Sequence, residues 1–114
     1  MSEDCLFCKI VRGEIPSRVV HRDDAVVAFE DINPGAPTHV LVIPVRHVKD
    51  ITELASDGEL LSKMFSVANE IARSRAIADA GYRTVFNVGP NAGQSVFHAH
   101  LHVLGGRQMG WPPG

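Results

Sequence analysis

Three histidines stand at every second position in the apolar run His-Ala-His-Leu-His-Val-Leu over residues 98–104. Two residues is the side-chain period of a β-strand, so this spacing predicts a strand that presents His98, His100 and His102 on one face. Because alternate strand residues lie about 6.6 to 6.8 Å apart, the outer two rings would be roughly 13 Å apart, too far for all three to bind one metal ion. We therefore expect the three rings to have different roles.

A short segment rich in small side chains stands just before this run. Residues 90–96 read Pro-Asn-Ala-Gly-Gln-Ser-Val, and such side chains let backbone N–H groups approach an anion. An ordinary strand connection has a similar composition, but the adjacent histidines favour an anion cradle. Neutral imidazole is a good nucleophile near neutral pH because its unperturbed pKa is about 6.5. Together, the two segments predict chemistry on a phosphate group.

The composition excludes several classes of function. The chain has 114 residues and a formal net charge of -2, so it lacks the basic excess of a nucleic-acid-binding protein. No stretch approaches the roughly 20 apolar residues of a membrane span, and the acidic start Met1–Asp4 lacks the apolar region of a secretion signal. We expect a single domain over residues 1–114, acting in the cytoplasm on a small molecule, with no nucleic-acid or membrane partner.

Turn and capping signals outline the elements that must position these residues. A short helix over Phe7–Ile15 is predicted to stop at Pro16, and a capping box over Ser56–Glu59 opens one long helix that runs to Asp79, with Gly81 as its stop. The predicted strands cover residues 18–22, 25–30, 38–44, 83–89 and 97–104. This order predicts an α+β fold with a mostly antiparallel five-stranded sheet. The apolar arc of the long helix is wide enough to bury the sheet on one side and a second subunit on another, which favours a homodimer.

At this point the sequence resembles a known family. The histidine run is similar to the signature of the histidine triad (HIT) superfamily, and further segments resemble its Hint branch. These segments are Phe29-Glu30-Asp31-Ile32, Ala36-Pro37-Thr38-His39, Asn87, Gly93-Gln94-Ser95, Gly105-Gly106-Arg107-Gln108-Met109 and Trp111-Pro112-Pro113-Gly114. The match spans nearly the whole chain, so it is far more specific than an alternating histidine row alone. One departure is Gly110, where close Hint relatives can carry a histidine before the tryptophan.

The resemblance implies a HIT-like fold, a homodimer and purine nucleoside phosphoramidase activity. Such an enzyme releases AMP or GMP from phosphoramidates such as AMP-lysine through a covalent nucleotidyl-histidine, without a catalytic metal. The resemblance implies that His100 is the nucleophile and that His102 and His39 lie beside the phosphate. The phosphate oxygens would be held by Asn87, Gly93 and Ser95 together with His100 and His102.

The resemblance also implies how the nucleoside is bound. Asp31 would bind the ribose hydroxyls, and Trp111 would cross the dimer to the opposite pocket. The base pocket would be lined by Phe7, Ile10, Phe29, Ile32 and Leu41. From the residues alone, Asp31 also fits a strand-end turn former, and the apolar side chains fit ordinary core better than a base pocket.

The two cysteines, Cys5 and Cys8, are too few and too close together for the disulfide framework of a secreted domain. Two thiolates make half of a tetrahedral zinc site, which His47 and the first histidine of the row, His98, could complete. We expect these four residues to hold a structural zinc ion that does not touch substrate. The competing interpretation is that the cysteines are small apolar packing residues.

Three other functions compete with the phosphoramidase. Hydrolysis of dinucleoside polyphosphates is typical of the fragile histidine triad branch, but a glutamine usually stands there where this chain has Leu101. A non-catalytic purine nucleotide sensor or interaction scaffold would keep its role after His100→Ala. A zinc hydrolase with His39, His100 and His102 as ligands would lose its activity in strong chelator.

Overall fold

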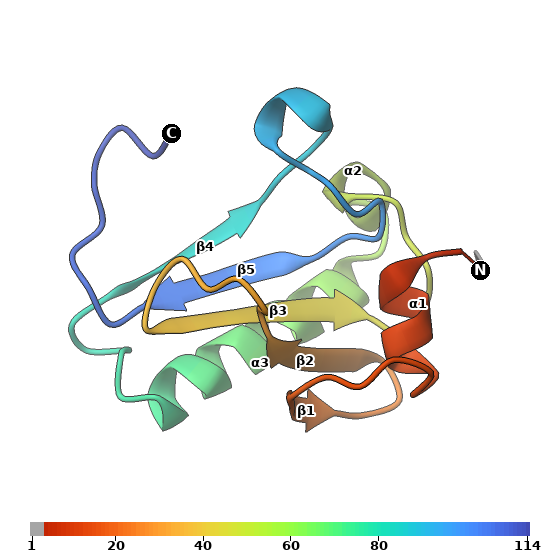
Figure 1. The fold of residues 1–114 in the computed structure, drawn as a ribbon, viewed down its shortest axis with the longest axis horizontal. Helices are drawn as coiled ribbons and strands as arrows, with labels where there is room; N and C mark the ends of the chain where they lie inside the picture. Colours follow the sequence, from red (N-terminus) through yellow and green to blue (C-terminus); the bar gives the residue numbers. More distant parts are fainter. Residues whose placement is uncertain (1–3) are drawn as a thin grey trace.

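The computed structural model describes residues 4–114; Met1–Glu3, most of the predicted acidic start, lie outside the described residues. Five strands form one sheet in the order β1-β2-β3-β5-β4, and every neighbouring pair is antiparallel (Figure 1). The elements are α1 (Leu6–Val11), β1 (Val19–Arg22), β2 (Val26–Glu30), β3 (Thr38–Pro44), α2 (Ile51–Leu54), α3 (Gly58–Ser74), β4 (Tyr82–Phe86), a 3-10 turn (Pro90–Ala92) and β5 (Leu101–Gly105). The predicted α+β fold is confirmed, with α2 and the 3-10 turn as additions.

The two faces of the sheet are covered by different helices. Along β2, Val26 and Ala28 pack into the core beneath α3, whereas Val27 and Phe29 pack with α1 on the other face. Figure 1 shows α3 behind the sheet and α1 in front of it at one end. β3 is buried along its whole length because it is covered on both faces. Among residues 4–114, none of the helices combines the length and apolar content that a membrane crossing requires.

The long helix α3 begins and ends at other residues than the sequence predicts. Its N-cap is Asp57, whose carboxylate accepts from the backbone N–H of Leu60, while the Ser56 hydroxyl donates to a carbonyl at the end of α2. Ala76 adopts a left-handed conformation with a φ of 57°, which turns the chain after Ser74 rather than at Gly81. The turn buries Ile77 against Gly105, where an added Cβ would lie 2.5 Å from the Ile77 side chain. Tertiary packing therefore ends this helix.

The short helix α1 also ends early. It stops at Val11, and Gly13 follows with a φ of 75°, a left-handed conformation that favours glycine. Pro16, the predicted stop, lies beyond this turn. The early stop leaves residues 12–18 to form part of the wall of the cavity described below, where Ile15, Pro16, Ser17 and Arg18 lie.

The histidine run is only partly a strand. β5 begins at Leu101, which pairs with Val42 of β3 and Phe86 of β4, and it places His102 opposite Leu41 and Val85. His98 and His100 lie before the strand, in a segment that bends at residues 96–98. The prediction of one strand over all three histidines was wrong, because the ladder partner β4 already ends at Phe86 and leaves residues 97–100 unpaired with it.

Candidate active site and metal centre

A cavity of about 1100 Å³ opens on the sheet face opposite α3. Its apolar wall includes all five side chains predicted to line the base pocket: Phe7, Ile10, Phe29, Ile32 and Leu41. Its polar part includes the residues predicted to lie near phosphate and ribose: Asp31, His39, Gly93, Ser95, His100 and His102. The fold thus brings segments from α1, β2, β3, β5 and the loop before β5 into one site.

His100 is held with a defined proton arrangement. Its Nδ1 lies 2.8 Å from the backbone carbonyl oxygen of His98, and a carbonyl can only accept, so Nδ1 carries the proton. In the neutral ring the lone pair is then on Nε2. The edge of Phe7 packs against this ring, with centroids 5.0 Å apart at 88°. Burial lowers the pKa of His100, which favours the neutral ring.

His39 and His102 form a second ordered pair. The backbone N–H of Gly35 donates to His39 Nδ1 at 2.9 Å, so in the neutral ring the His39 proton is on Nε2. That Nε2 lies 2.9 Å from His102 Nδ1 and 3.3 Å from Asp31 Oδ2. His102 Nδ1 therefore accepts, and its proton is on Nε2, which is buried and has no hydrogen-bond partner among residues 4–114. His102 thus keeps a buried, unused N–H donor in a ring that lines the cavity.

The same proton arrangement argues against a metal ion between these residues. Atoms of Asp31, His39 and His102 lie close enough together to hold an ion. However, a metal ligand must offer a lone pair, and His39 Nε2 carries a proton because its Nδ1 already accepts from Gly35. The hydrogen bond from Gly35 therefore argues against the competing function, a zinc hydrolase with His39, His100 and His102 as ligands.

The buried His102 gives the fold a defined pH dependence. Burial, together with His100 and His39, lowers the pKa of His102 from 6.5 to about 4. Between these values the unfolded chain binds a proton that the folded protein excludes, so stability is lost as pH falls from 6.5 toward 4. After allowance for the partial exposure of the ring, we expect a loss of about 1–2 kcal/mol.

Urea unfolding of the wild type and His102→Asn across this pH range measures the effect. The stability difference between the two proteins should narrow as pH falls, because the contribution of the neutral His102 ring disappears. An unchanged difference over the whole range would show that His102 has an ordinary pKa in the folded protein.

The predicted phosphate cradle is organised by a residue that the sequence did not single out for this role. The side-chain oxygen of Gln94 accepts from Gly89 N–H at 2.8 Å, and its amide nitrogen donates to the carbonyls of Lys49 and Val96. Gln94 is buried, and Gly93 before it has a φ of 87°, so the loop is fixed beside the cavity. Asn87 follows β4 and is not among the residues that line the cavity, so its contact with phosphate remains a prediction.

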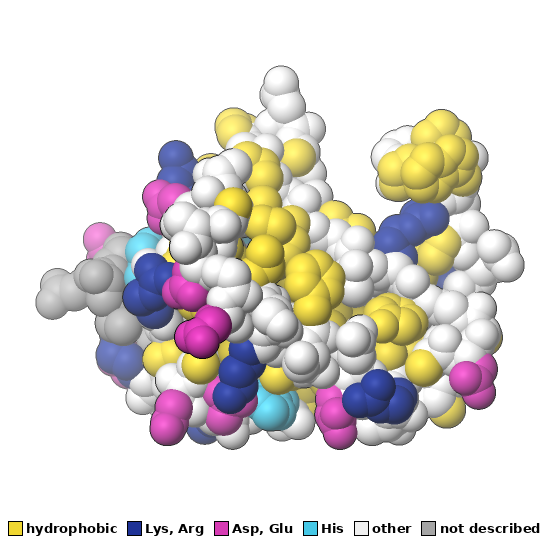
Figure 2. All heavy atoms as spheres, turned by 180° about the vertical axis from the view of Figure 1, so that it is seen from behind, with side chains coloured by type: hydrophobic (Ala, Val, Ile, Leu, Met, Phe, Trp, Pro, Cys, Tyr) yellow, Lys and Arg dark blue, Asp and Glu magenta, His cyan; other side chains and the backbone are white. Residues whose placement is uncertain are grey.

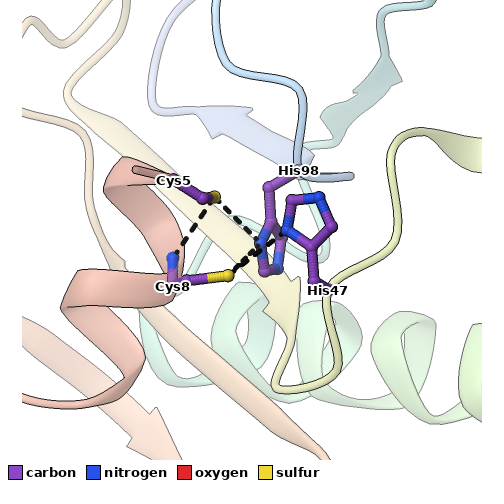
Figure 3. A group of neighbouring side chains, drawn as sticks. All are labelled: Cys5, Cys8, His47 and His98. Carbon is purple, nitrogen blue, oxygen red and sulfur yellow. Dashed lines mark hydrogen bonds between the residues drawn. The ribbon is translucent and has the colours of Figure 1, made fainter. Parts of the chain in front are cut away.

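The four predicted metal ligands meet at the N-terminal end of α1, as Figure 3 shows. Their ligand atoms all lie within 4.8 Å of one another. Cys8 Sγ lies 3.3 Å from His47 Nδ1, and His98 Nδ1 lies 3.4 Å from Cys5 Sγ and 3.5 Å from Cys8 Sγ. Nitrogen and sulfur ligands of a tetrahedral zinc ion stand about 3.5 Å apart, so these distances fit one ion.

The hydrogen bonding of His98 also fits a metal ligand. Its Nε2 lies 2.8 Å from the carbonyl oxygen of Pro44, so Nε2 carries the proton and the lone pair of Nδ1 points toward the two sulfur atoms. The neighbouring Ala99 N–H donates to the carbonyl of Val48, which ties the segment carrying His98 to the one carrying His47. The residues present can therefore hold a metal ion with two thiolates and two neutral imidazoles.

Comparison with known proteins identifies the family of this chain. The family model of the HIT domain matches residues 12–109. The chain belongs to the HIT family. As a HIT protein it is 45% identical to the purine nucleoside phosphoramidase of Escherichia coli, over 96% of this chain and 93% of that protein. It is 52% identical to the 14 kDa zinc-binding protein of Zea mays, over 96% of this chain and 87% of that one.

A solved structure shows the same fold. The HIT family hydrolase of Legionella pneumophila superposes with a TM-score of 0.94 at 51% sequence identity, covering 97% of this chain and 100% of that one. The sequence-based assignment of this chain to the HIT family is thereby confirmed.

The C-terminal tail of this HIT protein projects from the body. Figure 2 shows a hydrophobic group at the end of the tail beside a basic side chain, and a further hydrophobic strip in the middle of the same face. Trp111 is 82% exposed, and its ring is contacted by the Arg83 guanidinium, which also donates to the carbonyl of Gly110. Trp111 does not line the cavity of its own chain. Its predicted contact with a partner subunit remains a prediction.

Proposed function

We propose that this HIT protein is a purine nucleoside phosphoramidase that releases AMP or GMP from phosphoramidates such as AMP-lysine. The observation that carries the proposal is the pairing of two histidines in one cavity: His100 with an open Nε2 lone pair and His102 with an unused Nε2–H. An apolar wall suited to a purine adjoins them. The name of the Escherichia coli relative supports the same activity.

In the first step His100 Nε2 attacks the phosphorus of the phosphoramidate. A bond from Nε2 to phosphorus forms as the phosphorus–nitrogen bond breaks, and the leaving amine keeps that electron pair and takes up one proton from water. His102 Nε2–H donates to a phosphate oxygen, and the N–H groups and hydroxyl near Gly93 and Ser95 share the developing negative charge. Because the carbonyl of His98 holds the Nδ1 proton, the attacking lone pair is already aimed.

In the second step water attacks the phosphorus of the nucleotidyl-histidine. The bond to Nε2 breaks, its electron pair returns to His100, and the nucleoside monophosphate leaves with the water oxygen while one proton is released. Over both steps one water molecule is consumed and one amine is set free. No metal ion takes part in either step.

For the cluster of Cys5, Cys8, His47 and His98 we propose a structural zinc ion. When bound, zinc would bridge two thiolates and two imidazoles, and this cross-link would join α1 to the segments after β3 and before β5. The name of the Zea mays relative supports this choice of metal. Reduced thiols fit a cytoplasmic protein, and the exposed hydrophobic side chains, such as Val88, Phe97 and Trp111, fit a homodimer.

A substrate comparison tests the proposed activity. The purified protein should hydrolyse a lysine phosphoramidate of AMP at least tenfold faster than a diadenosine polyphosphate, with and without strong chelator. Faster cleavage of the polyphosphate would favour the fragile histidine triad activity. Tight nucleotide binding with no turnover of either compound would favour the sensor.

Ribose recognition by Asp31 gives a further prediction. Asp31→Asn removes the charge but keeps an oxygen that can accept from the Asn33 N–H, as Asp31 does at 2.8 Å. We expect kcat/KM for an adenosine phosphoramidate to fall about 10- to 100-fold, since hydrogen bonds to a charged group contribute about 1.5–3 kcal/mol. The 2′,3′-dideoxy substrate is the control, and its kcat/KM should fall much less, because Asp31 then acts only through its contact with His39 Nε2 at 3.3 Å. Equal losses for both substrates would remove ribose binding as the role of Asp31.

A further inference from the structure

Arg107, in the segment just after β5, is bound to the loop that carries Gly35. Its Nε and Nη2 donate to the carbonyl oxygen of Gly35 at 3.1 and 2.9 Å, and its Nη1 donates to the carbonyl of Gln108 at 3.0 Å. Two donors of one planar guanidinium therefore converge on a single oxygen, which fixes the position of that peptide group. Arg107 does not itself line the cavity.

The loop held in this way is the one that orders the histidine pair. The N–H of Gly35 donates to His39 Nδ1, which leaves the His39 proton on Nε2 to face His102. The same loop is in close contact with the residue before Arg107, because a Cβ added at Gly106 would lie 2.9 Å from Pro37. A continuous set of contacts thus runs from Arg107 through Gly35 and His39 to the free N–H of His102.

The two tautomers of this histidine pair have opposite effects on an anion. In the arrangement set by Gly35, His102 Nε2 carries a proton that has no partner among residues 4–114 and can be donated to a phosphate oxygen. If the His39 proton moved to Nδ1, His39 Nε2 would accept from His102 Nδ1–H, and His102 would present a lone pair that repels a phosphate oxygen. Asp31 Oδ2, 3.3 Å from His39 Nε2, favours the first arrangement too. Asp31 is also proposed to bind ribose, so the Gly35 N–H is the contact to His39 whose role is only to set the tautomer.

We propose that Arg107 is a positioning residue that fixes the tautomers of His39 and His102 by holding Gly35, so that His102 donates to the substrate phosphate. The proposal for tautomer control rests on the contacts alone, and its effect on turnover rests on the proposed function. Arg107 acts on the rate through three other residues and contributes nothing to purine binding.

Nitrogen NMR of the histidine side chains tests the tautomers directly, without any substrate. In the ligand-free wild type, His39 and His102 should each show a single protonated Nε2. In Arg107→Ala both rings should show the averaged signals of two tautomers. Arg107→Lys has a single ammonium in place of the planar guanidinium, so its nitrogen signals should lie between those of the wild type and those of Arg107→Ala. Arg73→Ala is the control, since Arg73 is an exposed arginine that pairs with Glu70 on α3. Unchanged nitrogen signals in the folded Arg107 variants would overturn the proposal.

Steady-state kinetics gives the second readout. We expect kcat for the lysine phosphoramidate of AMP to fall about 10- to 100-fold in Arg107→Ala with KM within about twofold, as for other residues that orient a reacting group indirectly. A loss confined to KM would contradict a role through His102. If the wild type fails to cleave phosphoramidates, the proposed function fails, while the NMR result still decides the role of Arg107.

Discussion

Replacing His100 with alanine lowers kcat for AMP-lysine hydrolysis by at least about 10⁴-fold, because the nucleophile of a two-step displacement has no substitute. Among residues 4–114, the other two histidines of the cavity have no free ring lone pair: His39 Nδ1 accepts from Gly35, and His102 Nδ1 accepts from His39. Nucleotide affinity should change far less than kcat, since the apolar wall and Asp31 remain. Initial rates and equilibrium binding of AMP to both proteins measure the two effects separately.

His21→Ala is the matched control for this variant. His21 lies on β1, outside the cavity lining, and pairs with Asp23 at 2.6 Å. Its removal should leave kcat unchanged. A His100→Ala protein that is folded and retains more than about one tenth of the wild-type kcat would contradict the role of His100 as nucleophile.

Loss of the metal centre is expected to be the largest stability effect. Cys8→Ala should abolish zinc binding and lower the free energy of unfolding by about 4 kcal/mol when free zinc exceeds its dissociation constant about a thousandfold. Alanine replaces a buried thiol with little change in volume, so most of the loss comes from the missing ligand. Zinc content per chain measures the loss of metal binding, and urea unfolding measures the loss of stability, each with and without chelator.

The chelator experiment separates the metal from simple packing. Wild-type protein in chelator should lose about as much stability as Cys8→Ala, and chelator should not affect Cys8→Ala any further. If purified wild-type protein contains no zinc and chelator leaves its unfolding unchanged, the cysteines are packing residues, which was the competing interpretation of the sequence.

Much of the fold follows from local patterns. β3 was predicted with its observed bounds, because a continuous β-branched run between turn residues has few other stable conformations. The C-terminal end of α3 was missed because a distant contact decides it: Ile77 must reach Gly105, and this forces the turn at Ala76. The start of β5 was missed for a similar reason, since the end of β4 leaves residues 97–100 without a partner on that side.

The site could be predicted residue by residue only where a motif or a familiar ligand set marked it. The cluster of Cys5, Cys8, His47 and His98 is brought together as the ligand types suggested. Gln94 and Arg107 belong to motif segments, yet their contacts depend on which carbonyl groups the fold places within reach. Proton positions on His39 and His102 follow from a backbone N–H at Gly35, and no sequence pattern specifies that contact.

Detection of the covalent intermediate tests the central claim most directly. Wild-type protein mixed with a slight excess of AMP-lysine and quenched within milliseconds should gain the mass of one adenylyl group, and peptide mapping should place it on His100. His100→Ala should gain none. Turnover in the wild type with no adduct at any time, or an adduct on another residue, would contradict nucleotidyl transfer through His100.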